Sequence, residues 1–333
     1  MNRYIHFLLP GLLTVISCFS QDRKFHFTET KMGSPFNLVI VCNDSAKAAL
    51  LAKRSFALVD SFNHIFSDYD PSSELSRVSA NAGNGKEQLS PAFWSIFSAS
   101  QKAWQKSKGT FDISVAPLSH LWKKARKEKY FPDSNEVRSK KQLTGLDKIK
   151  TDPINHSIQL PVKGMQLDLG GIAKGYVAQA VIDFLYSHGI HSALADAGGD
   201  MAMSNAPTGT RGWTVGVNIP ETTDDLLPKK LLLANRAVAT SGDAYQFIEH
   251  NGRRYSHIID PRTGYGISSQ RNVTVIAKNG TDADWLATAC SILPIGEAKQ
   301  LAARMGAELM ITTLENEKII YHKTKGFDRY WKP

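Results

Sequence analysis

The chain has 333 residues, of which 42% are hydrophobic, 21% charged and 9% aromatic. This length can build one large domain or two modest ones around a sizeable core, and the composition is that of a globular protein, not of a disordered or fibrous one. The net charge of +9 is spread along the chain, and its densest run, residues 123–129, includes an acid and is typical of a solvated helix face. We therefore expect no nucleic-acid partner. The excess of positive charge would be equally useful for attracting a small anionic substrate as for binding a nucleic acid or a membrane surface.

The first 20 residues resemble a secretory signal. Arg3 supplies positive charge, and residues 7–16 form an apolar run that is too short to cross a bilayer as a helix. The run ends just before Cys18 in a sequence similar to a bacterial lipoprotein box, whose cysteine becomes the lipidated first residue of the mature protein; cleavage after Ser20 is the alternative. We predict a signal peptide over residues 1–20 and a mature protein outside the cytoplasm, on the periplasmic side, either anchored to a membrane through diacylated Cys18 or soluble.

Several common kinds of site are excluded by the sequence. No Cys and His residues are spaced as a zinc site requires, and neither the G-x-G-x-x-G nor the G-x-x-x-x-G-K-[ST] phosphate-binding pattern occurs. Besides Cys18 there are only Cys42 and Cys290, each in an apolar segment where we expect a small core residue. A disulfide between these two stays open in an oxidising compartment.

Strands and helices are mixed along the first half of the chain. Tyr69 lies in a polar loop over 66–77 and could stack on a ring system. In residues 109–118, a glycine, an aromatic ring and a carboxylate stand between a helix and an apolar run, which suits the edge of a pocket. The expected elements are strands at 25–27, 36–42 and 157–160, a helix capped at 43–45 that runs through 62, a helix from Ser90 and Pro91 to Lys108 and Gly109, and a basic helix with loops at 121–150.

The rest of the chain is organised around residues 167–176. Apolar and polar residues alternate over 165–169 as in a half-buried strand, and apolar residues over 172–185 recur at helical spacing until Gly189. A glycine pair and Lys174 lie between the two patterns, where free N–H groups can face an anion and missing Cβ atoms let a phosphate approach. The alternative is a tight turn from strand to helix that binds nothing.

The second half adds another glycine pair and one notable histidine. Residues 196–200 place the glycines beside carboxylates at a strand end, where ligands gather in α/β sheets. His257 lies near the end of an expected strand, 254–259, which a strong β-turn sequence at 260–264 stops; such a histidine is more often structural than catalytic. Further strands are expected at 192–195, 213–219, 237–240 and 272–277, and the apolar connection 226–233 is left unassigned.

Asp284 and Thr288 stand four residues apart on an expected helix over 285–293, which residues 281–284 begin as a capping box. Their oxygens therefore project from one helix face, and carboxylate and hydroxyl oxygens are ligands suited to Mg²⁺, which shares ligands with substrate phosphates. The alternative is a cap and a threonine that bonds back to its own helix. A helix at 297–305 and a hairpin around 315–318 complete a chain without regular βαβ alternation, which predicts one compact α+β unit over residues 25–333.

Taken in order, these segments resemble the ApbE family of FAD:protein FMN transferases. The resemblance runs from residue 32 to the last helix; its most specific parts are 167–176, 257–264 and 284–288, supported by 67–77, 109–118 and 196–200. It implies a T-fold-like α+β body that binds FAD and Mg²⁺. It also implies a reaction that cleaves the FAD pyrophosphate, releases AMP and joins FMN through a phosphoester bond to a threonine or serine of a target flavoprotein.

The resemblance also implies roles for single residues. His257 matches the histidine proposed to activate the acceptor hydroxyl, a task that suits an imidazole. Asp284 and Thr288 match side-chain ligands of the metal, and Gly171 matches a position that offers it a backbone carbonyl. The residues that match the flavin-nucleotide site are Met32, Tyr69, Thr110, Phe111, Asp112, Asp168, Lys174 and Ile258.

Two other functions stay open from the residues themselves. A Mg²⁺-dependent FAD pyrophosphatase would need the same grip on metal and phosphate but would use water as the nucleophile. A flavin-binding lipoprotein without catalysis would need only the cavity. For the transferase, the resemblance suggests acceptors among subunits of membrane redox pumps or other extracytoplasmic flavoproteins.

Overall fold

The computed structural model describes residues 22–218, 226–242, 246–315 and 318–333. The expected signal peptide and Cys18 lie outside the described residues. None of the described helices has the length and apolar character needed to cross a membrane.

An eight-stranded sheet forms the centre of the fold, with the strand order β1-β2-β6-β7-β10-β13-β14-β15 and antiparallel pairing between all neighbours. A tight turn at Met32 and Gly33, both with positive φ, joins the first two strands as a two-residue hairpin loop. The strands are Arg23–Lys31 (β1), Ser34–Cys42 (β2), Ser192–Ala197 (β6), Asp200–Met203 (β7), Arg236–Ser241 (β10), Arg271–Ala277 (β13), Glu308–Glu315 (β14) and Lys318–Lys323 (β15).

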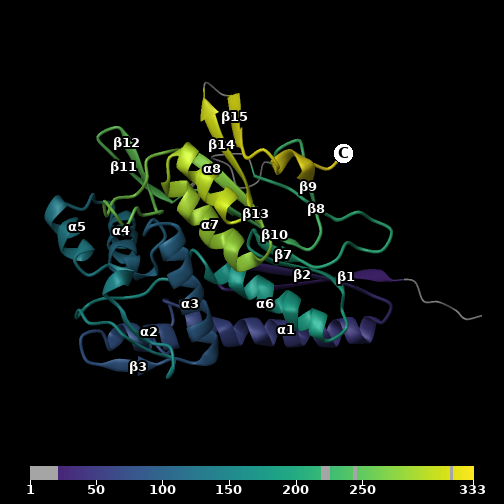
Figure 1. The fold of residues 1–333 in the computed structure, drawn as a ribbon, viewed down its shortest axis with the longest axis horizontal. Coiled ribbons are helices and arrows are strands. Elements are labelled where there is room, and N and C mark those ends of the chain that lie inside the picture. Colours follow the sequence, from purple (N-terminus) through teal and green to yellow (C-terminus); the bar gives the residue numbers. More distant parts are fainter. Residues whose placement is uncertain (1–21, 219–225, 243–245, 316–317) are drawn as a thin grey trace, which may run out of the picture.

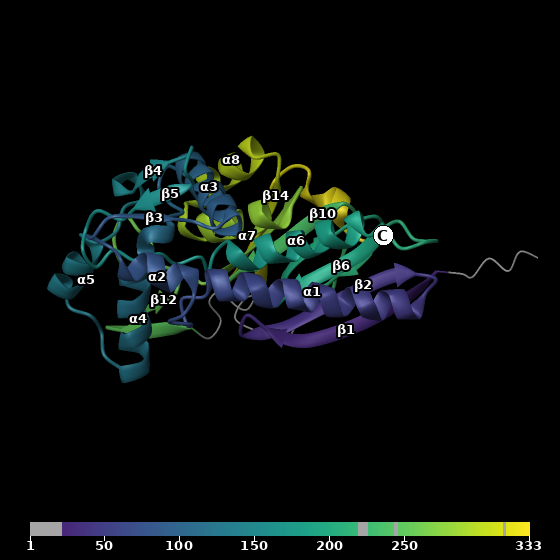
Figure 2. The ribbon, with the colours of Figure 1, turned by 90° about the horizontal axis from the view of Figure 1, so that it is seen from below.

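Helices cover one face of this sheet, and Figure 2 shows two of them, α1 and α6, lying along β1, β2 and β6. These helices are Ser45–Phe66 (α1), Ala173–Ser187 (α6), Gly280–Ile292 (α7) and Ile295–Arg304 (α8), and Pro91–Lys106 (α3) packs against α1 and α7. Because side chains alternate along a strand, Leu38 and Ile40 of β2 enter the main core beneath the helices, whereas Val39 and Val41 face a smaller core on the other side. That smaller core is closed by Trp213–Val215 (β8), Leu231–Leu233 (β9) and the 3₁₀ helix Phe327–Tyr330 (η3).

A separate lobe lies at the end of the molecule opposite the C-terminus (Figure 1). It consists of Ala116–Glu128 (α4), Ser134–Lys141 (α5) and the hairpin of Phe247–His250 (β11) and Arg253–Ser256 (β12). Rings of Trp122, Phe131, Tyr255 and Tyr265 pack together at its centre, and the Trp122 indole N–H donates to the Gly264 carbonyl at 2.8 Å. The lobe therefore holds the segment that follows β12 in a fixed position.

Smaller elements connect the lobe to the sheet. They are Glu74–Ala80 (α2), the three-stranded sheet of Lys86–Gln88 (β3), Ser157–Gln159 (β5) and Lys150–Asp152 (β4), and the 3₁₀ helices Ile113–Val115 (η1) and Leu146–Lys148 (η2). The mixture of an antiparallel sheet with helices on one face confirms the predicted α+β class. Two of the expected helix caps are also confirmed, because Asp44 begins α1 and Ser90 begins α3 through their side-chain oxygens.

The structure corrects the expected strand before the central glycines. Residues 165–169 do alternate between buried and half-buried positions, but they pair with no strand. The Asp168 N–H donates to the Ile113 carbonyl at 2.7 Å and the Leu167 N–H donates to Ser79 Oγ at 3.2 Å. A loop and a side chain thus replace a neighbouring strand as hydrogen-bond partners.

Other boundaries also differ from the predictions. Asn279, not Thr281, caps α7, since its side-chain oxygen accepts the Asp282 N–H at 2.8 Å; the expected capping box at 281–284 is wrong. The strand expected over 213–219 ends at residue 215, and the unassigned stretch 226–233 contains β9. Cys42 and Cys290 are both free thiols, so the disulfide left open by the sequence does not form.

Candidate active site

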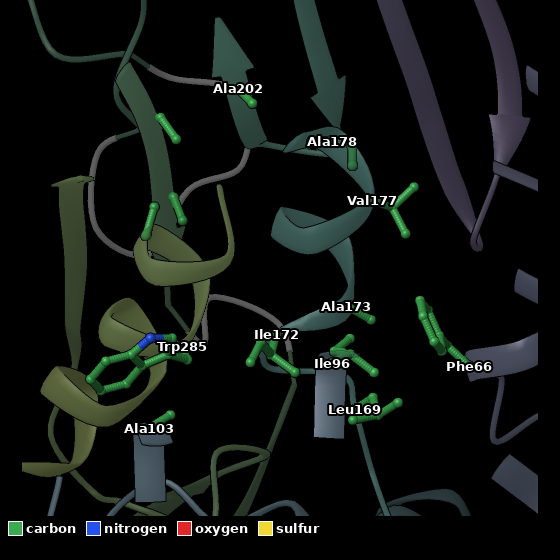
Figure 3. Close-up of a cluster of buried hydrophobic side chains, with 14 of the residues drawn as sticks. Phe66, Ile96, Ala103, Leu169, Ile172, Ala173, Val177, Ala178, Ala202 and Trp285 are labelled. Atoms are coloured by element: carbon green, nitrogen blue, oxygen red, sulfur yellow. The ribbon is translucent and has the colours of Figure 1, made fainter. Parts of the chain in front are cut away.

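The central turn, residues 169–173, is anchored on its apolar side in the main core. Figure 3 shows Leu169 and Ile172 among side chains from three helices, including Phe66 of α1, Ile96 of α3 and Trp285 of α7. The two glycines between Leu169 and Ile172 line a cavity instead. The glycine pair is therefore held at the cavity wall by the burial of its apolar neighbours.

The cavity has a volume of about 390 Å³ and lies between this turn, α7 and the lobe. This is within the size range of small-molecule sites. The predicted site residues that line it are Tyr69, Thr110, Phe111, Asp112, Asp168, Gly171, Lys174, His257, Ile258, Asp284 and Thr288. Met32 is absent from the described lining; it lies in the β1–β2 turn, and its binding role stays a prediction.

Asp284 and Thr288 lie on α7 where this helix crosses α6. The Gly175 N–H of α6 donates to Asp284 Oδ2 at 2.8 Å. A Cβ atom on Gly171 would lie 3.0 Å from Thr288 Oγ1, so the turn rests directly against that hydroxyl. Asp284 is only 5% exposed, and burial, together with the charge of Asp200, raises its pKa well above the usual range. One carboxylate, one hydroxyl and one stretch of glycine backbone thus meet at one side of the cavity.

Lys174 forms an ion pair within the cavity wall. Its Nζ atom lies 2.6 Å from Asp200 Oδ2 at the start of β7, and Asp200 is 5% exposed. Burial alone would lower the pKa of Lys174, but the charges of Asp200 and Asp284 outweigh burial and raise it. The ammonium is therefore charged, and because Lys174 lines the cavity it can meet an anionic group there. Asp200 was not among the predicted site residues, although the Gly-Gly-Asp sequence at a strand end had pointed to this region.

His257 follows β12 and is held by backbone contacts. The backbone N–H of His257 donates to the Gln246 carbonyl at 2.7 Å, and the next two residues, Ile258 and Ile259, are buried. The Nδ1 atom is buried and has no hydrogen-bond partner among the described residues. Burial and the positive charge of Arg126 lower the pKa of His257 to about 4. The imidazole is consequently neutral near pH 7 and has a free nitrogen lone pair to accept a proton.

Asp112 shapes the cavity wall through the backbone. Its Oδ1 atom accepts the Ser114 N–H at 2.8 Å and the Ser114 hydroxyl at 2.6 Å, and its Oδ2 atom accepts the Leu146 N–H at 3.1 Å. These bonds use both carboxylate oxygens to cap η1 and to tie it to η2. Asp112 therefore positions the neighbouring Thr110 and Phe111, both buried, at the cavity surface.

Several polar residues at the mouth of the cavity were missed by the sequence analysis. Helix α4 contributes a row of side chains at helical spacing, namely Ser119, His120, Lys123 and Arg126. Asp68 joins them from the loop that carries Tyr69. The basic run at 123–129 had been interpreted as a solvated face, and Lys124 and Lys127 are indeed exposed, but Lys123 and Arg126 also line the cavity.

The chain is similar to known proteins of one family. The family model described as the ApbE family matches residues 32–311. The chain is 29% identical over 266 residues to a protein of Klebsiella pneumoniae named FAD:protein FMN transferase, with 80% of this chain and 81% of that protein covered. Among solved structures, the apo form of the Pseudomonas stutzeri flavinyl transferase ApbE matches with a TM-score of 0.82 at 27% identity, covering 93% of this chain and 98% of that one.

The ApbE protein of Thermotoga maritima matches with a TM-score of 0.84 at 25% identity, covering 93% of this chain and all of that one (100%). The same fold therefore extends over almost the whole described chain. The family model, in turn, spans the central turn, His257 and the Asp284–Thr288 pair. The chain belongs to the ApbE family.

Proposed function

We propose that this protein is an FAD:protein FMN transferase, which moves FMN from FAD to a threonine or serine hydroxyl of an acceptor flavoprotein and releases AMP. The observation that carries the proposal is the convergence, in one cavity, of the Asp284–Thr288 oxygens, the charged Lys174 and a neutral His257 with an unpartnered nitrogen. The similarity to proteins named FAD:protein FMN transferase supports it.

The residues at the α6–α7 crossing fit a magnesium ion. Within the described chain no group of three or more His, Cys, Asp and Glu side chains could hold a metal by itself. The donors at this crossing are instead a carboxylate, a hydroxyl and glycine backbone, an all-oxygen set that suits Mg²⁺ when substrate phosphates complete its coordination. Asp284, Thr288 and the Gly171 carbonyl would hold the ion, and a bound Mg²⁺ would neutralise charge on the pyrophosphate and on the departing AMP.

The chain's own residues account for binding and proton movement. Lys174 stays charged beside Asp200 and can hold a phosphate oxygen that the α6 N-terminus also favours. The neutral imidazole of His257 accepts the proton of the acceptor hydroxyl as the oxygen attacks phosphorus. Phe111, packed against Trp285 at a centroid distance of 6.1 Å, offers a fixed apolar surface to a flat ring.

The decisive experiment mixes the protein with FAD, Mg²⁺ and a candidate acceptor protein. We expect the acceptor to become fluorescent and to gain the mass of FMN, because FMN is attached to it covalently. We expect His257→Gln to lower the transfer rate by about 10²–10⁴-fold without abolishing FAD binding, because only the base is removed. Mass spectrometry and flavin fluorescence give the two readouts.

The same assay without acceptor separates the alternatives. AMP and free FMN produced without acceptor, with no labelling of the acceptor when it is present, would identify a pyrophosphatase, in which water replaces the acceptor hydroxyl. Tight FAD binding with no product in either arm, and no effect of removing metal, would identify a non-catalytic flavin-binding protein. Either result would contradict the transferase.

We also propose that the mature protein is extracytoplasmic and anchored to a membrane through lipidated Cys18. The apolar run that ends just before Cys18 supports this location, and two acyl chains would suffice for stable anchoring. We expect the full-length chain to sediment with membranes when it is expressed in bacteria, and Cys18→Ser to shift it to the soluble fraction. Cys42→Ser is the matched control and should stay with the membranes; a soluble wild type would refute the anchor.

A further inference from the structure

A second histidine lies in the cavity wall and has no role in the proposed reaction. His120 projects from α4, and its two ring nitrogens face two different acceptors. Nε2 lies 3.5 Å from Asp68 Oδ2, and Nδ1 lies 3.1 Å from Gln166 Oε1. With the amide oxygen of Gln166 toward the ring, as here, a neutral imidazole could donate to only one of the two oxygens; a neutral ring would fit both contacts only with the Gln166 NH₂ group turned toward Nδ1. The arrangement therefore suits an imidazolium, which donates from both nitrogens.

The charges around His120 favour the same protonation state. The hydrogen bond to Asp68 raises the pKa of His120 against the opposing effect of burial, and the Gln166 contact and the charge of Asp168 add to the rise. Lys123, one helical turn further along α4, is the nearby cation, and it stacks over the Tyr69 ring at 3.5 Å from the centroid. Two carboxylates from two other segments thus favour the protonated imidazole.

The loop that contains Asp68 is braced internally. Ser67 Oγ accepts the Tyr69 N–H at 3.2 Å, the Ser73 hydroxyl donates to the Ser67 carbonyl at 2.5 Å, and the Ser76 hydroxyl donates to the Asp70 carbonyl at 2.8 Å. Because Tyr69 follows Asp68 directly in this hydrogen-bonded loop, a contact that holds Asp68 also restrains Tyr69. The Tyr69 ring itself is 76% exposed at the mouth of the cavity and is contacted there by the Lys123 ammonium, so the backbone of the loop sets where the ring stands.

We propose that His120 is a positioning residue for the flavin nucleotide: as an imidazolium it joins Asp68 to Gln166 and so keeps Tyr69 over the mouth of the cavity, where the ring can cover the bound ligand. The identity of that ligand, FAD, rests on the proposed function. Loss of the His120 proton removes one of the two donors and releases the loop from the wall formed by residues 165–170.

The sign of the pH effect follows from the raised pKa. A histidine whose folded-state pKa is raised is fully protonated below its ordinary value of about 6.5 and loses its proton as the pH rises through the higher folded-state value. The affinity for FAD should thus be higher at pH 6 than at pH 9. His257, with its pKa near 4, does not change charge in this window.

The test measures the dissociation constant of FAD from pH 6 to 9 at saturating Mg²⁺, for the wild type and for His120→Gln. The ratio of the two constants at each pH cancels the titration of groups that both proteins share. We expect His120→Gln to bind about tenfold more weakly at pH 6, where the wild-type imidazole is protonated, and to equal the wild type at pH 9. Asp68→Asn should act in the same direction, and His120→Arg, which keeps a cation with several donors, should remove the pH dependence but retain binding.

His64→Gln is the matched control. His64 pairs with Asp70 of the same loop at 3.4 Å, but it is 65% exposed and does not line the described cavity, so we expect no change in FAD affinity. A constant ratio of wild type to His120→Gln across the pH range would overturn the proposal while leaving FAD binding intact. No FAD binding by the wild type at any pH would overturn the proposed function as well, and so the two failures are distinguishable.

Discussion

Replacement of Asp284 by asparagine is expected to lower the rate of FMN transfer by more than about 100-fold, because even residues that only support a metal ligand typically contribute 10–100-fold. The variant should still fold. Asparagine can accept the Gly175 N–H as Asp284 does at 2.8 Å, and it carries no charge into a site that is 5% exposed.

The stability of this variant should depend on pH in a defined direction. Burial raises the pKa of Asp284, so the native protein holds that proton more tightly than the unfolded chain does. The stabilisation from this carboxyl is present below its unfolded pKa and is lost as the pH rises through the folded value. Urea unfolding should therefore show that Asp284→Asn gains stability relative to the wild type on going from pH 5 to pH 8, while activity stays low at both.

Asp282→Asn is the matched control on the same helix. Asp282 accepts the Trp285 indole N–H at 3.1 Å near the start of α7 and does not line the described cavity. We expect a loss of stability of about 0.5–1 kcal/mol from the weakened helix start, with transfer activity retained. Wild-type activity in Asp284→Asn at saturating Mg²⁺ would show that Asp284 does not hold the metal.

Replacement of Gly175 by alanine is expected to destabilise the protein by about 1–3 kcal/mol or more, as overpacking in a tight core does. An added Cβ atom would lie 2.6 Å from the Asp284 Cβ atom and would overlap the Gly280 carbonyl oxygen even more closely. Since both obstacles belong to α7, the two helices must separate. The separation would stretch the Gly175–Asp284 hydrogen bond, so activity should fall together with stability.

Gly296→Ala in α8 is the control for this helix substitution. A Cβ atom there would meet nothing within 4 Å, and alanine is favoured over glycine in a helix, so the variant should be as stable as the wild type or up to about 1 kcal/mol more stable. Urea denaturation midpoints of the two variants give the comparison. A Gly175→Ala protein with wild-type stability would mean that α6 and α7 do not pack in this way.

Local signals accounted for the predictions that were confirmed. Asp44 and Ser90 cap their helices through N–H groups two or three residues away, so the sequence alone shows both ends of each interaction. The end of α6 at His188 also depends only on nearby residues. So does the placement of Asp284 and Thr288 on one face of α7, since they are four residues apart on one helix. Such features need no knowledge of the rest of the chain.

The missed features depend on partners far away in the sequence. His120 meets Gln166, 46 residues later, and Lys174 meets Asp200 across the end of a strand. The alternating residues 165–169 have the pattern of a strand, yet a loop carbonyl and Ser79 take their N–H groups. The cap of α7 is different, because Asn279 accepts the Asp282 N–H only three residues away; that local signal was present in the sequence and was overlooked.

The sequence by itself determined the α+β class, the starts of α1, α3 and α6 and the turn at the central glycines, because each rests on contacts within a few residues. Only the tertiary structure decided which side chains share a cavity and which of them carry a charge. Burial makes His257 neutral, the Asp200 contact keeps Lys174 charged, and the glycine contact between α6 and α7 brings Asp284 to the central turn. Solvation and charge depend on surroundings that packing creates, and for that reason they cannot be derived from the order of the residues alone.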